Sequence, residues 1–297
     1  MTEAPAPPPA DPPGLPKAVR VVLGERGVSC YRRAPGPPGA PTLLLLHGWT
    51  ASSALNWFAC YEQLAQHFDV VAIDHRGHGR GIRSRRRFRL EDCADDAIAL
   101  ADSLGIDQLV PVGYSMGGPV AQLMWRRHRN RVSGMVLCAT SRYFVGDRPG
   151  ERAVAPMLGL ASLVARATPS RLHRTLGERL LSSRYDETEL GRWARREVSR
   201  NSPRAIVEAG QALASFSSAA WIGNVDVPTA VVVTELDSVV PVRRQRALAA
   251  AIPDASVHPV PGDHGVCAMD PGLFVPVLVD ACLSVTARAQ ADRRRAG

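Results

Sequence analysis

The residues best suited to chemistry lie in the pentapeptide GYSMG, within the run QLVPVGYSMGGPVAQLMW. A short apolar run precedes it and a helical pattern follows, which predicts a sharp strand-to-helix turn with Ser115 at its apex. Such a turn strains its central residue, and Gly113 and Gly117 leave room that side chains would fill. The Ser115 hydroxyl would then stand at a helix N-terminus, where the helix dipole favours negative charge. Ser115 is therefore the predicted nucleophile.

A serine hydroxyl attacks poorly unless a base removes its proton, so this interpretation requires a histidine and an orienting acid downstream. Four histidines follow the serine: His128, His173, His258 and His264. His264 alone occupies a loop directly after a predicted strand, in VPGDHGV, where flanking glycines let its ring project toward the carboxyl edge of a sheet. His264 is the predicted general base.

The orienting acid is expected to follow the strand-like run TAVVVT. Asp237, in TELDSVVP, stands just past this run and before the helix that begins at Pro241, so it can accept the ring N–H of His264. Three other carboxylates are less well placed: Asp226, Glu235 and Asp263. Asp237 is the predicted acid.

An acyl-transfer site also needs donors for the oxyanion of its tetrahedral intermediate. The backbone N–H of Met116, immediately after Ser115, can supply one. The loop HGWTASS follows the run TLLLL, and there Gly48 lets the backbone approach a substrate while the Trp49 N–H is the natural second donor. The Trp49 side chain could instead line a pocket. His47 precedes the serine and opens this loop, so we expect it to shape the turn.

Elements that alternate along the chain must position these residues. Two runs near Gly27 predict an antiparallel hairpin, and six near-continuous apolar runs predict strands buried on both faces of a parallel sheet: residues 42–46, 69–74, 108–113, 132–140, 229–234 and 255–260. Helical patterns lie between them: residues 57–68, 90–105, 116–127, 242–252 and 273–285. This alternation predicts an α/β fold with a doubly wound, mostly parallel sheet.

The alternation of predicted strands and helices divides the chain into a core, an insertion and two tails. Residues 17–140 and 221–286 form the predicted core, whereas residues 141–220 contain helical segments without a convincing strand. We expect this interval to form a helical cap over the ligand crevice at the carboxyl ends of the strands. The Pro-rich residues 1–16 predict a disordered tail, and residues 287–297 predict a fraying basic tail.

A formal net charge of +8 raises the question of nucleic-acid binding. The densest positive cluster, Arg76 to Arg89, lacks interleaved aromatic residues, and no nucleic-acid recognition motif accompanies it. We therefore expect a solvated loop, or one that attracts anionic ligands, and no specific nucleic-acid partner. The role of this loop is left open by the sequence.

Other features indicate a cytoplasmic protein that acts on a small molecule without a metal. The six cysteines are scattered without metal-ligand spacing, which predicts reduced and mostly buried thiols. The longest apolar runs are strand-sized, so no transmembrane segment is expected. The N-terminus lacks the cationic start and apolar centre of a secretory signal.

Taken together, LLLLHGW, VVAIDHRGHGRG, GYSMGG, TELDSVVP and GDHG resemble the α/β-hydrolase superfamily, in particular its compact, cap-bearing serine esterase-like members. The resemblance covers roughly residues 18 to 286 by motif order. It implies a triad of Ser115, His264 and Asp237, an oxyanion hole formed by the Trp49 and Met116 amides, and no metal or organic cofactor.

The resemblance also implies an activity: cleavage of an ester-like bond in a small, partly apolar substrate through an acyl-enzyme. Ser115 speaks against haloalkane dehalogenases and epoxide hydrolases, which place an aspartate at this position. Thioesterase, lactonase, C–C hydrolase, cofactor-free peroxidase and acyltransferase chemistry all remain alternatives, as does a binding protein that senses a small ligand. The physiological substrate, its acyl length and the oligomeric state stay open.

Overall fold

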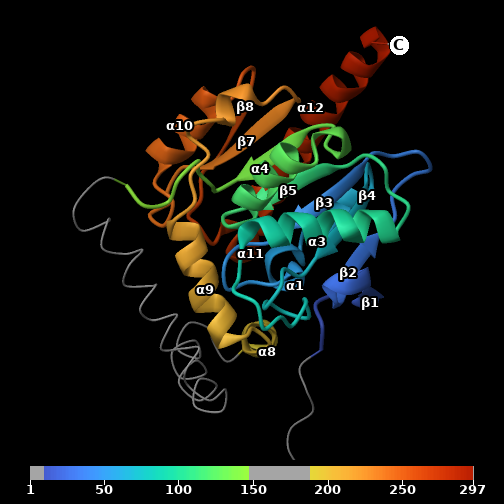
Figure 1. The fold of residues 1–297 in the computed structure, drawn as a ribbon, viewed down its shortest axis with the longest axis vertical. Coiled ribbons are helices and arrows are strands. Elements are labelled where there is room, and N and C mark those ends of the chain that lie inside the picture. Colours follow the sequence, from blue (N-terminus) through green and yellow to red (C-terminus); the bar gives the residue numbers. More distant parts are fainter. Residues whose placement is uncertain (1–9, 147–187, 297) are drawn as a thin grey trace, which may run out of the picture.

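The computed structural model describes residues 10–146 and 188–296. Its centre is one eight-stranded sheet in the order β1-β2-β4-β3-β5-β6-β7-β8 (Figure 1). The strands are β1 (Val19–Val22), β2 (Val28–Ala34), β3 (Thr42–Leu46), β4 (Asp69–Ile73), β5 (Val110–Tyr114), β6 (Met135–Cys138), β7 (Thr229–Thr234) and β8 (Ser256–Val260). Strand β2 pairs antiparallel with β1 and β4, and all other pairs are parallel. The predicted fold class is therefore confirmed.

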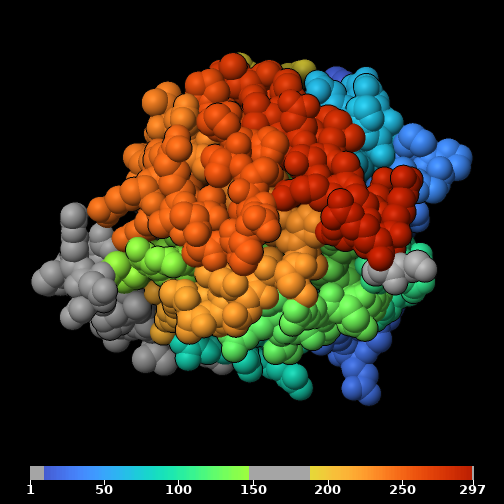
Figure 2. Space-filling view, turned by 90° about the horizontal axis from the view of Figure 1, so that it is seen from above, coloured from blue at the N-terminus to red at the C-terminus, as the bar shows by residue number. Residues whose placement is uncertain are grey.

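Helices connect the strands and cover the sheet. The α-helices of the described residues are α1 (Ser53–Trp57), α2 (Tyr61–Ala65), α3 (Leu90–Ser103), α4 (Gly117–Arg127), α8 (Glu189–Ser199), α9 (Pro203–Ala214), α10 (Val242–Ala251), α11 (Val266–Met269) and α12 (Pro271–Ala296). Figure 1 places α10, drawn in orange, at the far end of the sheet from the N-terminal strands β1 and β2, and Figure 2 shows blue N-terminal and orange C-terminal surfaces on opposite sides of the molecule.

The two faces of the sheet bury separate apolar clusters. In β3, Leu44 and Leu46 pack into the cluster that includes residues of α3, α4 and α10. Leu43 and Leu45 face the opposite cluster, with residues of α1, α2, α11 and α12. Because both faces of each central strand are covered, alternate residues gain nothing from being polar, which explains the continuous apolar runs.

Two helices differ from their predicted bounds. The pattern at residues 57–68 predicted one helix, but the structure has α1 and α2, separated by a turn in which the Cys60 N–H donates to the Trp57 carbonyl at 2.9 Å. Helix α1 begins four residues before the predicted start because the Ser52 side chain caps it, accepting from the Leu55 N–H at 3.2 Å.

The C-terminal helix is longer than predicted. The sequence placed its end at Val285 with a fraying tail after it, whereas α12 continues to Ala296. Alanines and arginines favour helix here, and Arg288 donates to the Thr229 and Asp254 carbonyls at 2.8 Å each. Pro271–Arg295 is also long and apolar enough by composition to cross a membrane, which the strand-sized runs did not reveal. In this structure its apolar residues pack against the sheet.

The N-terminal segment also differs from its prediction over residues 10–16. Asp11 accepts hydrogen bonds from the Trp193 indole at 3.1 Å and from Arg196 at 2.9 Å, both in α8. Leu15 packs against the apolar clusters beside α1 and α2. These contacts order a stretch whose composition alone indicated disorder.

The predicted cap at residues 141–220 lies partly outside the described residues, which exclude 147–187. Within the interval, the structure places α8 and α9 beside the loops that follow β3 and β4. The division into core and cap stays a prediction. The predicted cysteine state agrees with the structure, in which all six thiols are free and five of them are buried.

Candidate active site

Ser115 occupies the turn between β5 and α4 in a strained backbone conformation. Its φ is +51°, in the left-handed region that non-glycine residues seldom adopt and that costs about 1–3 kcal/mol. Neighbours hold the turn: the Ser115 N–H donates to the Cys138 carbonyl at 2.9 Å, and the Thr140 hydroxyl donates to the Ser115 carbonyl at 2.8 Å. The sharp strand-to-helix turn predicted from GYSMG is therefore present.

The flanking glycines are required by close backbone contacts. A Cβ on Gly113 would lie 2.3 Å from the Gly117 carbonyl oxygen, and one on Gly117 would lie 2.0 Å from the Leu46 carbonyl oxygen. Neither position can hold a side chain unless β3, β5 and α4 move apart.

The structure brings the three predicted triad residues together. His264 lies in the loop between β8 and α11, and its Nε2 is 3.0 Å from the Ser115 Oγ. Its Nδ1 is 2.7 Å from Oδ2 of Asp237, which follows β7. Both distances are within hydrogen-bonding range, so one ring links hydroxyl to carboxylate.

Asp237 has a fully buried carboxylate with several donors. Its Oδ1 accepts the backbone N–H groups of Val239 and Val240 at 2.8 Å each, and its Oδ2 also accepts the Thr234 hydroxyl at 2.8 Å. Burial by itself would raise the pKa of this carboxyl group, but the His264 contact and these donors outweigh it and hold the pKa below the ordinary 3.8. The carboxylate is therefore ionised at neutral pH and oriented toward the ring.

The rival carboxylates have other partners. Glu235 pairs with Arg246 at 3.0 Å, Asp263 accepts the Gly265 N–H at 2.7 Å, and Asp226 accepts the Trp125 indole at 3.0 Å. Two rival histidines are likewise engaged elsewhere, His128 with Asp95 at 2.8 Å and His258 with Ser256 at 3.1 Å. His173 lies outside the described residues.

The two predicted oxyanion donors flank the serine. A Cβ on Gly48 would lie 3.4 Å from the Ser115 Cβ, so the loop after β3 runs directly beside Ser115. Met116 follows Ser115 and is the N-cap of α4. Over the residues that the structure describes, neither the Trp49 nor the Met116 N–H has a protein acceptor. Within the described residues both amides are therefore available to donate to an oxyanion, as the sequence predicts.

His47 shapes the predicted oxyanion loop, residues 47–52 after β3, as the sequence indicated. Its Nε2 is 2.9 Å from the His75 N–H, and its Nδ1 is 2.8 Å from the Gly48 carbonyl, so only the neutral Nδ1–H tautomer satisfies both contacts. Burial lowers the pKa of His47 and keeps it neutral. Because C=O and N–H point in opposite directions in a trans peptide, holding the Gly48 carbonyl also orients the Trp49 N–H.

The Trp49 side chain is anchored rather than free. Its indole N–H donates to the Ile206 carbonyl of α9 at 2.8 Å, and a Cβ on Gly210 would lie 2.7 Å from its ring. Sequence reasoning did not find this contact. It joins residues 157 positions apart, and no local pattern signals it.

The basic cluster Arg76 to Arg89 is only partly solvated. Arg76 is buried and contacts Asp96 at 2.7 Å, and Arg80 contacts Glu197 at 2.8 Å. Arg85, Arg86 and Arg87 are exposed. The expectation of a solvated loop is therefore wrong for the first two arginines, which bind carboxylates of the protein itself. No cluster of three or more potential metal ligands occurs in the ranges 10–146 and 188–296.

Known proteins show the same sequence pattern. Residues 41–271 match the model of the family described as alpha/beta hydrolase fold. The chain is 30% identical over 226 residues to a pimeloyl-acyl-carrier-protein methyl ester esterase of Chromobacterium violaceum, covering 74% of this chain and 85% of that protein. It is 32% identical over 126 residues to Epoxide hydrolase B of Mycobacterium tuberculosis, covering 40% of this chain and 34% of that protein.

The fold is also found among solved structures. A thermophilic esterase from Thermogutta terrifontis aligns with a TM-score of 0.70 at 24% identity, over 91% of this chain and 99% of that one. The chain therefore belongs to the alpha/beta hydrolase family, and it is a hydrolase enzyme.

Proposed function

We propose that this hydrolase cleaves an ester-like bond of a small, partly apolar substrate through an acyl-enzyme on Ser115. The observation that carries the proposal is the chain of contacts from Ser115 Oγ through His264 to Asp237, at 3.0 and 2.7 Å. A buried carboxylate, a bridging imidazole and a hydroxyl on a strained turn are the parts that an activated serine needs.

In the first half-reaction the Ser115 Oγ attacks the ester carbonyl carbon while His264 Nε2 takes the hydroxyl proton. Asp237 stabilises the imidazolium that forms, because its carboxylate accepts the Nδ1–H. The carbonyl oxygen becomes an oxyanion that accepts the Trp49 and Met116 N–H groups. The proton then passes from His264 to the alkoxide leaving group as the C–O bond breaks, which leaves the acyl group on Ser115.

In the second half-reaction a water attacks the acyl carbonyl while His264 Nε2 accepts one water proton. The same two amides bind the second oxyanion, and its collapse breaks the bond to Ser115 Oγ as His264 returns the proton. The products are the carboxylic acid and the regenerated serine. Every step uses groups of this chain and water.

The similarity to a methyl ester esterase supports an ester as the substrate class. The partial match to an epoxide hydrolase covers a smaller share of the chain, and Ser115 at the nucleophile position favours acyl chemistry. We expect p-nitrophenyl butyrate or hexanoate to be turned over faster than the acetate. A rate that stays flat or falls as the acyl chain lengthens would contradict an apolar acyl site.

The experiment that tests the activated serine is intact-mass analysis after exposure to a fluorophosphonate. The wild type should gain one adduct rapidly, Ser115→Ala should gain none, and His264→Ala should react far more slowly. His258→Ala is the matched control, because its ring contacts Ser256 away from the triad, and it should react like the wild type.

Failure of the folded wild type to form an adduct would favour the alternative class, a binding protein with this fold. Thioester, lactone and acyl-transfer substrates should be screened only after an adduct is found, since all of them use the same activated serine. A cytoplasmic location and the lack of a specific nucleic-acid partner stay predictions from the sequence.

A further inference from the structure

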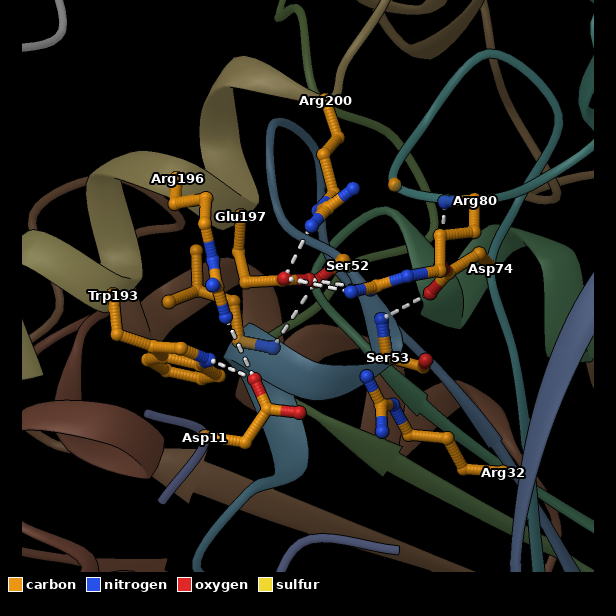
Figure 3. Close-up of polar contacts among 12 residues, drawn as sticks. Asp11, Arg32, Ser52, Ser53, Asp74, Arg80, Trp193, Arg196, Glu197 and Arg200 are labelled. Atoms are coloured by element: carbon orange, nitrogen blue, oxygen red, sulfur yellow. Dashed lines mark hydrogen bonds and ion pairs between the residues drawn. The ribbon is translucent and has the colours of Figure 1, made fainter. Parts of the chain in front are cut away.

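The junction between α8 and α9 is bound to the loops that surround the nucleophile. At the end of α8, the buried carboxylate of Glu197 contacts Arg80 at 2.8 and 3.1 Å and Arg200 at 3.1 Å, and it lies beside Ser52 (Figure 3). Arg80 belongs to the loop after β4, and Ser52 is the last residue of the predicted oxyanion loop after β3. One carboxylate therefore links α8 to both loops.

Asn201, in the same junction, contacts both loops through a single amide. Its Nδ2 donates to the Thr50 carbonyl at 2.6 Å, and its Oδ1 accepts the Gly79 N–H at 2.8 Å. A carbonyl can only accept and a backbone N–H can only donate, so the two partners define which amide atom is nitrogen. The Ser202 N–H adds a bond to the Gly77 carbonyl at 2.8 Å.

The Asn201 contact continues through the backbone to the predicted oxyanion donor. Asn201 donates to the carbonyl of the peptide between Thr50 and Ala51. The N–H of the same peptide, that of Ala51, donates to the Gly48 carbonyl at 3.3 Å. The Gly48 carbonyl belongs to the peptide whose N–H is that of Trp49. In a trans peptide the C=O and N–H groups point in opposite directions. A hydrogen bond that holds the C=O of one peptide therefore also sets the direction of its N–H, first at Ala51 and then at Trp49. Bonds arranged in such a chain also polarise one another.

Thr50 needs such support because its backbone is strained. Its φ is +65°, and a β-branched residue in the left-handed region is an outlier that costs about 1–3 kcal/mol. It occupies the third position of the turn closed by Gly48 and Ala51, where this conformation normally calls for glycine or asparagine. The strong Asn201 bond to its carbonyl opposes relaxation of this turn.

We propose that Asn201 is a positioning residue for the oxyanion hole. It holds Thr50 in its left-handed conformation and thereby orients and polarises the Trp49 N–H toward the oxyanion. The inference rests on the proposed serine hydrolase function. It makes the α8–α9 junction, 86 residues after Ser115 in the chain, a determinant of the chemical step.

Hydrolysis of p-nitrophenyl butyrate by variants of the full chain tests this role. Deleting one oxyanion donor costs about 10²–10³ in kcat, and Asn201→Ala misaligns a donor without deleting it, so kcat should fall roughly 10-fold with KM little changed. Asn201→Asp should lose more, because it keeps the acceptor for Gly79 but sets a carboxylate oxygen against the Thr50 carbonyl. Asn130→Ala, at an exposed asparagine far from the site, is the matched control and should behave like the wild type.

A double-mutant cycle with Thr50→Gly separates this role from a general effect on folding. Glycine adopts a positive φ at little cost, so Asn201→Ala should reduce kcat less in the Thr50→Gly background than in the wild type. Thermal unfolding of each variant shows whether the fold is intact. Equal losses of kcat in the two backgrounds, or no loss in Asn201→Ala, would overturn the inference.

The fluorophosphonate adduct distinguishes the two proposals. A wild type that forms the adduct and turns over ester, together with an Asn201→Ala variant of unchanged kcat, contradicts only the role of Asn201. A folded wild type that neither forms the adduct nor turns over ester contradicts the serine hydrolase function, and the role of Asn201 with it.

Discussion

The Tyr114 hydroxyl donates to the backbone carbonyl of His264 at 2.8 Å, so the residue before Ser115 holds the backbone of His264. The two residues are 150 positions apart, at the ends of β5 and of the loop after β8. Burial raises the pKa of the Tyr114 phenol, which therefore remains a neutral donor. The contact couples the position of the imidazole to that of the serine turn.

Tyr114→Phe tests this coupling. The change leaves the His264 carbonyl without its donor, which should lower the free energy of unfolding by about 1–3 kcal/mol. Displacement of the ring should lower kcat by roughly 10-fold, less than the ~10² that a 1 Å misplacement can cost. Urea unfolding and ester hydrolysis measure the two effects. Tyr143→Phe is the control, because Tyr143 contacts arginines outside the triad. An unchanged Tyr114→Phe variant would show that the contact positions nothing.

Gly117→Ala should disrupt the turn at the nucleophile. The added Cβ would meet the Leu46 carbonyl at 2.0 Å, and a main-chain atom of a central strand cannot yield as a flexible side chain could. We expect a loss of about 3 kcal/mol or more in unfolding free energy together with loss of the fluorophosphonate adduct. Gly272→Ala, where nothing lies within 4 Å of the new Cβ, is the matched control. A stable, reactive Gly117→Ala protein would contradict the geometry of this turn.

Asp237→Asn should lower kcat by roughly 10³–10⁴, because an amide can hold the imidazole in the wrong tautomer. Steady-state ester hydrolysis measures this loss.

The Asp237 carboxylate should also make stability depend on pH. In the folded protein the pKa of this carboxyl group lies below its ordinary 3.8, so its ionisation stabilises the fold above pH 3.8, and this contribution is lost as the pH falls through the folded pKa. The difference in unfolding free energy between wild type and Asp237→Asn should therefore shrink on acidification to about pH 3. A difference that does not change over this range would show that the carboxylate gains nothing from folding.

A cluster of buried histidines beneath the oxyanion loop should make the fold sensitive to acid. His47, His75 and His78 are all buried. The centroid of the His47 ring lies 4.3 Å from that of His75 and 5.3 Å from that of His78. Burial lowers the pKa of all three, that of His78 to about 3, so they stay neutral in the fold. Unfolded histidines take up protons below 6.5, so this contribution to stability is present above 6.5 and is lost between 6.5 and the folded values.

His78→Asn tests the cluster, since the amide can keep a donor for the Arg76 carbonyl that His78 contacts at 3.1 Å. The wild type should lose up to about 1.4 kcal/mol of unfolding free energy per pH unit for each neutral histidine between pH ~6.5 and 5, and His78→Asn should lose correspondingly less. Urea unfolding across this range measures both slopes, with the exposed His67→Asn as control. Parallel slopes for His78→Asn and wild type would contradict the prediction.

The sequence could predict the strands and the triad geometry because both depend on short-range pattern and chain order. Leu43 to Leu46 are apolar because both faces of β3 are covered, and glycines mark the turn at Ser115 because backbone passes within contact distance. His264 and Asp237 follow strands whose carboxyl ends share one edge of a parallel sheet. Such features leave a local trace in the residues themselves.

Other features left no such trace. Asn201 and Tyr114 acquire their roles from partners 151 and 150 positions away, which only the packed structure brings near. The division of residues 57–68 into two helices depends on a turn that helical periodicity does not reveal. The ion pair of half-buried Arg80 with the buried Glu197 likewise depends on where α8 packs, so composition alone assigned that arginine to a solvated loop.

The proposed mechanism requires that Ser115 carry the acyl group of the substrate during turnover. Rapid mixing with p-nitrophenyl butyrate, followed by acid quench and mass analysis of the peptide that contains Ser115, measures this intermediate. In the wild type we predict a butyryl mass increment on that peptide during turnover, together with release of p-nitrophenol. In Ser115→Ala we predict neither signal. Sustained turnover of the ester by Ser115→Ala at the wild-type rate, or a butyryl group trapped on another residue, would contradict the account.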